Sequence, residues 1–259
     1  MLCPDPIMPD CAQLTPLRPA EPCFVTYECS SAAMAAEPHA LGADEIHIWH
    51  ADPAQTAFDG SALRNLLSAD ELARMMRFRF EDDRRNFVFG RGMLRMLLAS
   101  YLGASPAELL FAYSAHGKPG LATSSGGLEF NLSHSNGTLL IAISQRRKIG
   151  VDIERVRHDI EIDEIARRFF SPAERHSLDQ IFDHSRPDAF FRCWTRKEAW
   201  LKARGDGLSF PLSAFDVLDV RADGTVQLVT RPDPAEALRW SIFSIAAPQG
   251  YAAAVAVSN

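Results

Sequence analysis

The sequence predicts an α+β protein made of two similar halves of about 105 residues each, with helices packed on small, mostly antiparallel sheets. Two observations support this class. Segments of similar composition recur in the same order at a nearly constant spacing, which indicates an internal repeat. Within each copy, strand-like apolar runs flank one long helical segment. We therefore expect the two halves to be related by a pseudo-twofold axis.

The elements of the two halves can be matched one by one. Each half opens on an apolar strand, and a helix-start signal follows, with Ser at the N-cap and an acid in the first turn. A long helical segment comes next, then a proline before a strand-like run, then a closing strand introduced by glycine. The matched pairs are residues 46–49 and 151–154, 67–71 and 170–174, 86–99 and 191–204, Pro106 and Pro211, and 137–144 and 250–257.

Residues 1–43 lie outside this repeat. They contain seven prolines and no clear period, so we expect an irregular extension, dispensable through residue 40, ahead of halves spanning 44–148 and 149–259. Four of the five cysteines fall in the first 29 residues without a Cys-x-x-Cys pair, and we expect them to stay reduced. No basic region precedes an apolar stretch, and no apolar run approaches 18 residues. A cytoplasmic protein without membrane contact is expected.

The composition is that of a soluble globular protein, with 47% hydrophobic and 23% charged residues. A net charge of −6 argues against broad binding of nucleic acid. Between Arg64 and Arg95, however, eight arginines stand against five acids. This local excess of positive charge suits a small anion better than a long duplex.

Three carboxylates form a candidate metal site. Asp152 and Glu154 alternate along a predicted strand and therefore point to the same face. Glu198 lies on a predicted helix, between Lys197 and Lys202. If the fold brings the three acids together, oxygen ligands without nearby Cys or His favour a hard cation, with Mg²⁺ as the natural candidate. Lysines beside such a site suit a polyphosphate substrate.

Each motif also has an ordinary structural explanation. Asp152 and Glu154 could be solvent-facing acids, and an i,i+4 pair of Glu198 with Lys202 would contribute only a few tenths of a kcal/mol to a helix. Ser133 and His134 are adjacent on a strand and point to opposite faces, which argues against a Ser–His nucleophile pair and leaves His134 as a phosphate donor. The turn at residues 116–119 is not a Walker-type phosphate loop.

The repeat assigns the charges to different halves. If residues of the two halves are paired at a constant spacing of about 105 positions, His47 and Trp49 correspond to Asp152 and Glu154. Met93 then corresponds to Glu198. The acids therefore belong to the second half, whereas the corresponding helix of the first half supplies arginine. A ligand in the cleft between the halves would meet acids on one side and arginines on the other.

Five short motifs follow one another along the chain. They are Gly-Lys-Pro at 117–119, Phe-Asn-Leu-Ser-His-Ser at 130–135, Gly-Val-Asp-Ile-Glu at 150–154, Arg-Arg-Phe-Phe-Ser-x-x-Glu at 167–174 and Trp-Thr-x-Lys-Glu-Ala-x-x-Lys at 194–202. Their order and spacing resemble those of the 4′-phosphopantetheinyl transferases, in the larger, pseudo-dimeric type that activates nonribosomal peptide and polyketide synthetases. The resemblance covers roughly residues 45–257.

The resemblance implies transfer of the phosphopantetheine arm of coenzyme A to a serine of an acyl or peptidyl carrier protein, with release of adenosine 3′,5′-bisphosphate. It implies that Asp152, Glu154 and Glu198 hold Mg²⁺, and that Asp152, Glu198 and Lys202 take part in catalysis. Either Glu198 or a water on the metal would accept the serine proton. Coenzyme A contacts are implied for Arg74, Arg91, Gly117, Lys118, Pro119, Ser133, His134 and Lys202.

Two other functions use the same residues. An Mg²⁺-dependent pyrophosphatase or nucleotidase would act on coenzyme A or a nucleotide with water as nucleophile, and it would need no carrier protein. A non-catalytic module would bind a carrier protein or a nucleotide, but all three acids of a catalytic site are present. The expected partners of the transferase are coenzyme A and a carrier protein, and the protein itself is expected to be a monomer.

Overall fold

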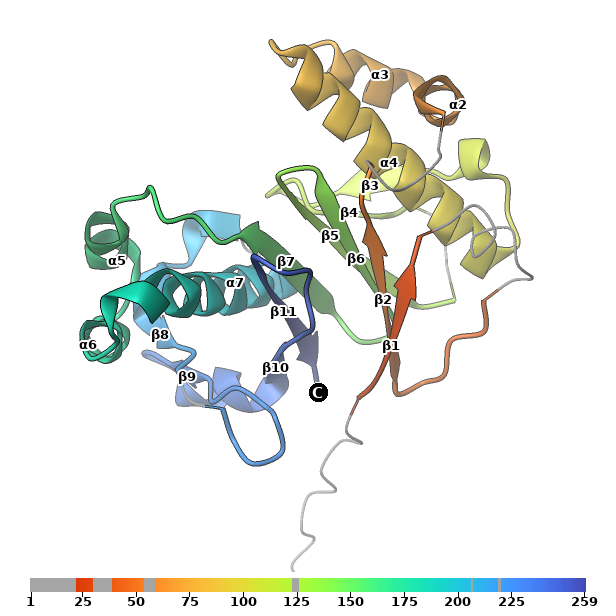
Figure 1. Ribbon diagram of the computed structural model, residues 1–259. Coiled ribbons are helices and arrows are strands. Elements are labelled where there is room, and N and C mark those ends of the chain that lie inside the picture. The colour runs from red at the N-terminus through yellow and green to blue at the C-terminus, as the bar shows by residue number, and fades with distance from the viewer. Residues whose placement is uncertain (1–21, 30–38, 54–58, 123–125, 206, 219) are drawn as a thin grey trace, which may run out of the picture.

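The computed structural model describes residues 22–29, 39–53, 59–122, 126–205, 207–218 and 220–259 (Figure 1). Two α+β halves lie side by side, each with one long helix packed on its sheet. The fold class expected from the sequence is confirmed, because both sheets are small and mostly antiparallel. Within these ranges, no helix is both long and apolar enough to cross a lipid bilayer.

The first half contains a four-stranded sheet in the order β1-β2-β6-β5, in which only the β1–β2 pair is parallel. The long helix α4 covers its outer face, and a short hairpin, β3–β4, follows the helix. The elements are β1 Cys23–Glu28, β2 Glu45–Ala51, α2 Gly60–Asn65, α3 Ala69–Met75, α4 Glu81–Leu102, η1 Pro106–Glu108, β3 Phe111–Tyr113, β4 Pro119–Leu121, β5 Leu128–Ser135 and β6 Thr138–Gln145.

The second half repeats this order around a three-stranded antiparallel sheet, β10-β11-β7. Its long helix, α7, packs on β7 and β11. The elements are β7 Ile149–Arg155, α5 Ile162–Phe169, α6 Pro172–Asp179, η2 Asp183–Ser185, α7 Arg186–Arg204, η3 Gly207–Ser209, η4 Leu212–Ala214, β8 Phe215–Asp216, β9 Val229–Thr230, η5 Pro234–Arg239, β10 Trp240–Ser244 and β11 Tyr251–Ser258.

Strand β1 corrects the expectation that the whole of residues 1–43 is an irregular extension. Cys23–Glu28 pairs in parallel with β2 along its full length. Tyr27 stacks on Trp49 with ring centroids 4.4 Å apart, and Phe24 meets Phe243 of the second half at 5.0 Å. The segment is short and follows Pro22, so its strand character appears only when β2 offers it an open edge. Residues 1–21 and 30–38, with Cys3 and Cys11, lie outside the described residues.

The helix caps set the true register of the repeat. Both long helices end at a glycine with positive φ, 60° at Gly103 and 81° at Gly205, a conformation that glycine adopts without a steric penalty. Counted back from these caps, Met96 occupies the position of Glu198, so the expected pairing of Glu198 with Met93 is wrong. The constant offset fails because α4 has 22 residues and α7 has 19.

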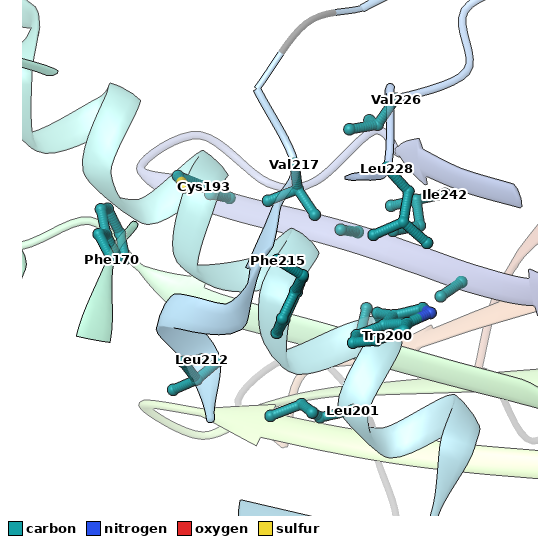
Figure 2. Close-up of a cluster of buried hydrophobic side chains, with 14 of the residues drawn as sticks. Phe170, Cys193, Trp200, Leu201, Leu212, Phe215, Val217, Val226, Leu228 and Ile242 are labelled. Atoms are coloured by element: carbon teal, nitrogen blue, oxygen red, sulfur yellow. The ribbon is translucent and has the colours of Figure 1, made fainter. Parts of the chain in front are cut away.

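Three hydrophobic cores organise the molecule. One lies under α4 and one under α7, where Trp200 and Phe215 pack with ring centroids 4.3 Å apart (Figure 2). The third lies between the two sheets and receives Ile149, Val151 and Ile153 from β7. Because side chains alternate along a strand, the other face of β7 is turned towards α7.

Each half also contains the same buried ion pair between a helix cap and the long helix. In the first half, the capping-box Glu71 accepts a 2.7 Å hydrogen bond from Arg95. In the second half, the capping-box Glu174 contacts Lys197 at 2.7 Å. Both cations also donate hydrogen bonds to backbone carbonyls of the segment that follows the long helix. Arg95 donates to Pro106 and Leu109, and Lys197 donates to Leu212 and Phe215.

Lys197 is therefore a structural residue: it is fully buried, and its ammonium contacts Glu174 and two backbone carbonyls. Replacing Lys197 by Met should lower the free energy of unfolding by about 3–5 kcal/mol, because Glu174 would stay buried without its counter-ion. Chemical denaturation measures the change, with Lys148→Met on the exposed surface as the control. A loss below 1 kcal/mol would show that the pair is not needed for folding.

Strand β1 makes the outcome of truncation depend on where the chain is cut. Deletion of residues 1–21 leaves β1 intact, so the melting temperature should stay within about 2 °C of the full chain. Deletion of residues 1–29 should lower it by roughly 10 °C and promote aggregation, because the edge of β2 and two aromatic contacts become exposed. Equal melting of both truncated chains would contradict a structural role for β1.

Candidate active site

One cavity of about 480 Å³ gathers nearly all of the residues predicted from the sequence. It opens between the halves, with α4, the β3–β4 loop and β5 on one side and β7 and α7 on the other. A larger cavity, about 970 Å³, is lined by residues of the first half and shares Asn86 with the 480 Å³ cavity. The predicted residues that line the 480 Å³ cavity are Arg74, Arg91, Gly117, Pro119, Ser133, His134, Asp152, Glu154, Glu198 and Lys202.

The acids are positioned by the close approach of α7 to β7. Gly150 lies directly under the helix, and a Cβ atom there would overlap the carbonyl oxygen of Ala199 and the backbone of Ala203. Since Asp152 is two residues further along β7, it lies on the same face of the strand. Its carboxylate therefore lies beneath α7, next to the turn that carries Lys202.

Alternate residues of β5 hold β7 from the first half. Asn131 Oδ1 accepts a 2.9 Å hydrogen bond from the amide of Val151. The Ser133 hydroxyl donates to Asp152 Oδ1 at 2.8 Å. Farther along, Ser135 Oγ is 2.7 Å from Glu154 Oε2.

The roles of Asn131 and Ser135 were missed by the sequence analysis, which singled out Ser133 and His134. The signal was present, because Asn, Ser and Ser alternate in Phe-Asn-Leu-Ser-His-Ser and must share one face of the strand. His134 lies on the opposite face, is exposed and lines the cavity. The argument against a Ser–His pair agrees with this arrangement.

Lys202 supplies the positive charge on the acidic side. Its Nζ lies 2.7 Å from Asp152 Oδ1 and 2.8 Å from Ser133 Oγ. Asp152 is only 3% exposed, and its second oxygen, Oδ2, is buried without a hydrogen-bond partner. A buried carboxylate oxygen that lacks a partner is an unusual feature, which a bound cation would explain.

The other two acids resist ionisation. Burial raises the pKa of Glu154 and of Glu198, and the neighbouring carboxylate of Asp152 raises both further. Lys202 acts in the opposite direction on each of them. Bringing several carboxylates into one half-buried cleft therefore carries an electrostatic cost that a cation would relieve.

The donor set fits a hard divalent cation, because all three side chains offer oxygen and Asp152 Oδ2 is free to bind one. In the arrangement described, no group of three His, Cys, Asp or Glu side chains among the described residues is close enough to hold a metal ion. The ammonium of Lys202 contacts Asp152 instead. Coordination would therefore require side-chain movement in the cleft.

The first half faces these acids with arginines. Arg91 is 6% exposed, and its Nε lies 3.3 Å from Glu71 Oε1. Its Nη1 atom is buried without a hydrogen-bond partner. Arg74 is exposed and lies over the rings of Phe87 and Tyr113, at 5.7 and 5.9 Å. This wall of the cavity offers guanidinium groups to an anion.

Lys118 is the one predicted residue outside this cavity. It lines an adjoining space of about 220 Å³, together with Glu198 and Lys202. Its Nζ donates to the carbonyl oxygens of Ile149 at 2.9 Å and Ala203 at 3.3 Å. Burial lowers the pKa of Lys118 to about 8.

Carboxylates and a lysine on one wall and arginines on the other make a cleft suited to a phosphate-bearing substrate, and its place between duplicated halves is typical of enzyme sites. Two models of known protein families match the chain and identify its family. Residues 148–256 match the 4′-phosphopantetheinyl transferase superfamily, and residues 49–146 match the model described as 4′-phosphopantetheinyl transferase, N-terminal. The chain belongs to the 4′-phosphopantetheinyl transferase family.

Individual relatives agree with this assignment. The chain is similar to the 4′-phosphopantetheinyl transferase HetI of a Nostoc species, with 38% identity over 85% of this chain and 90% of the relative. A 4′-phosphopantetheinyl transferase of Bacillus subtilis is 33% identical over 62% of this chain and 70% of its own length. The transferase Sfp of the same species is 30% identical, with coverages of 63% and 71%. The match to HetI is long enough to include both halves.

Gly150 offers a direct test of how the site is held together. Replacement by Ala should destabilise the protein by at least about 1–3 kcal/mol and lower activity by roughly 100-fold, since α7 must move away from β7 and carry Glu198 with it. Gly60→Ala is the matched control, because a Cβ at that helical position meets nothing within 4 Å. Thermal melting and turnover near the parent values for Gly150→Ala would contradict the close approach.

Proposed function

We propose that this protein transfers the 4′-phosphopantetheine arm of coenzyme A to a serine of acyl or peptidyl carrier proteins, with release of adenosine 3′,5′-bisphosphate. The observation that carries this proposal is the single cleft in which Asp152, Glu154, Glu198 and Lys202 face two arginines of the other half. The naming of its relatives as 4′-phosphopantetheinyl transferases supports the same reaction.

The arginine wall would bind the adenosine end of coenzyme A. Arg91 has a buried Nη1 that lacks a partner, and Arg74 lies at the exposed mouth beside it, so a 3′-phosphate would be bound between two guanidinium groups. Gly117 and Pro119 line the same cavity and would contact the nucleotide through backbone and ring atoms.

The acidic side would hold the pyrophosphate. His134, Ser133 and Lys202 line this part of the cavity and would donate hydrogen bonds to its oxygens, where negative charge builds up during transfer. Asp152, Glu154 and Glu198 would hold Mg²⁺, which when bound would neutralise charge on the pyrophosphate oxygens. Binding of the pyrophosphate would draw Lys202 away from Asp152 and so release the carboxylate.

The chemical step is an in-line exchange at phosphorus. The serine oxygen of the carrier protein forms a bond to the phosphorus that carries the pantetheine arm, and the bond from that phosphorus to the bridging oxygen breaks. Adenosine 3′,5′-bisphosphate leaves with the bridging oxygen. Glu198 is the side chain we assign to accept the serine proton, because its carboxylate lines the cleft beside Lys202 and Ser133, where the pyrophosphate would lie.

Mass spectrometry of carrier proteins tests this function. The full chain is incubated with coenzyme A, Mg²⁺ and apo carrier proteins from fatty-acid, polyketide and peptide synthesis, and a mass gain equal to the arm is expected with one released nucleotide per modified serine. Asp152→Asn should reduce the rate at least 100-fold, because it removes a charged ligand without changing shape. Glu108→Gln, on the exposed surface, is the control.

One result would reject the proposed reaction, and another would reject the role assigned to Asp152. Release of nucleotide from coenzyme A at the same rate with and without carrier protein would indicate a hydrolase. Unchanged transfer by Asp152→Asn at saturating Mg²⁺ would remove this carboxylate from the site.

A further inference from the structure

Lys118 lies in the first half but its side chain ends in the second. It belongs to the loop between β3 and β4, and its ammonium bonds the carbonyls of Ile149 at the start of β7 and Ala203 in the last turn of α7. Its stem lies against Gly205, where an added Cβ would be 3.7 Å from Lys118 Cδ. The side chain thus crosses the junction of the two halves.

The two acceptors belong to the elements that carry the acidic site. Carbonyls in the last turn of a helix have no helical partner, and a cation there interacts favourably with the helix dipole. Ala203 follows Lys202 directly, and Ile149 precedes the Gly150 contact. Lys118 therefore bonds α7 and β7 beside their close approach at Gly150.

The loop around Lys118 is a tight turn, so the position of Lys118 also sets the position of the neighbouring cavity wall. The Ser114 amide donates to the Lys118 carbonyl, and the Ser114 carbonyl accepts from the Gly117 amide, each at 2.9 Å. Ser114 Oγ accepts from the Lys118 amide at 3.1 Å. Gly117 has φ of 81°, which favours glycine. Both Gly117 and Pro119 line the cavity, so fixing Lys118 fixes this wall.

We propose that Lys118 is a positioning residue that braces the Gly-Lys-Pro loop against α7 and β7, rather than a ligand of a coenzyme A phosphate. This inference rests on the proposed function only for its effect on coenzyme A. The contacts that form the brace are made by the protein without substrate and do not depend on that function.

The electrostatics of Lys118 support a brace. Burial and the nearby Lys148 lower its pKa, while Glu129 acts in the opposite direction, and the result is a value of about 8. A lowered pKa is expected of an ammonium that is buried against neutral carbonyl oxygens instead of a counter-ion. A neutral amine would still donate hydrogen bonds to two carbonyls, so the brace survives deprotonation.

Hydrogen exchange of the protein without substrate tests the brace. In Lys118→Met and in Lys118→Arg, amides of residues 114–121 and of the last turn of α7 should exchange roughly tenfold faster than in the parent. The Met side chain cannot donate the two hydrogen bonds, and the larger Arg side chain does not fit the space that the lysine occupies. Lys148→Met, a neighbouring lysine on the exposed surface, should leave exchange unchanged. Should Lys118→Met lose cooperative melting, Lys118→Gln is measured in its place.

Calorimetric titration with coenzyme A then separates a brace from a phosphate ligand. A brace predicts that the Met and Arg variants both bind coenzyme A about tenfold more weakly, because each disturbs the wall. Unchanged exchange in both variants, with near-normal affinity retained by Lys118→Arg, would overturn the proposal in favour of a phosphate contact. If the parent did not bind coenzyme A, the proposed function would fail while the exchange result still decided the brace.

Discussion

The contact of α7 with β7 over Gly150 is the constraint on which the rest of the site depends. Only a residue without a Cβ allows the helix backbone to lie this close to the strand. The helix then brings Glu198 and Lys202 over the face of β7 that carries Asp152 and Glu154. Lys118 and β5 bond β7 from the other half, so one strand is held from several directions at once.

The duplicated halves share their structural charges but differ in their functional ones. Each half ties a capping-box glutamate to a buried cation on its long helix, which fixes the helix against the segment that follows it. The site residues do not repeat in this way, because Met96 stands where the other half has Glu198. A cleft between two such halves is acidic on one wall and basic on the other, an arrangement that suits the coenzyme A substrate we propose.

The acidic wall is a place where function opposes stability. Burial raises the pKa of Glu154 and Glu198, so their charged forms are disfavoured in the folded protein. For an acid whose pKa rises on folding, this destabilisation is fully present above the raised pKa. It falls progressively below that pH and is gone once the pH is below the pKa of the unfolded chain. Lys202 and the hydroxyls of Ser133 and Ser135 offset part of the cost. The remaining imbalance is what favours a bound cation.

The sequence by itself determined the fold class, the repeat and most of the residues that line the candidate cleft, because period-two alternation fixes which side chains of β7 share a face and capping residues mark where helices begin. It did not determine the strand character of Cys23–Glu28, which depends on the free edge of β2, or the position of Met96, which depends on helix length. The direction of the Lys118 side chain was also decided only by tertiary structure. Local pattern specifies which residues are able to bind a ligand, whereas contacts between distant segments decide which of them are already engaged by the protein itself.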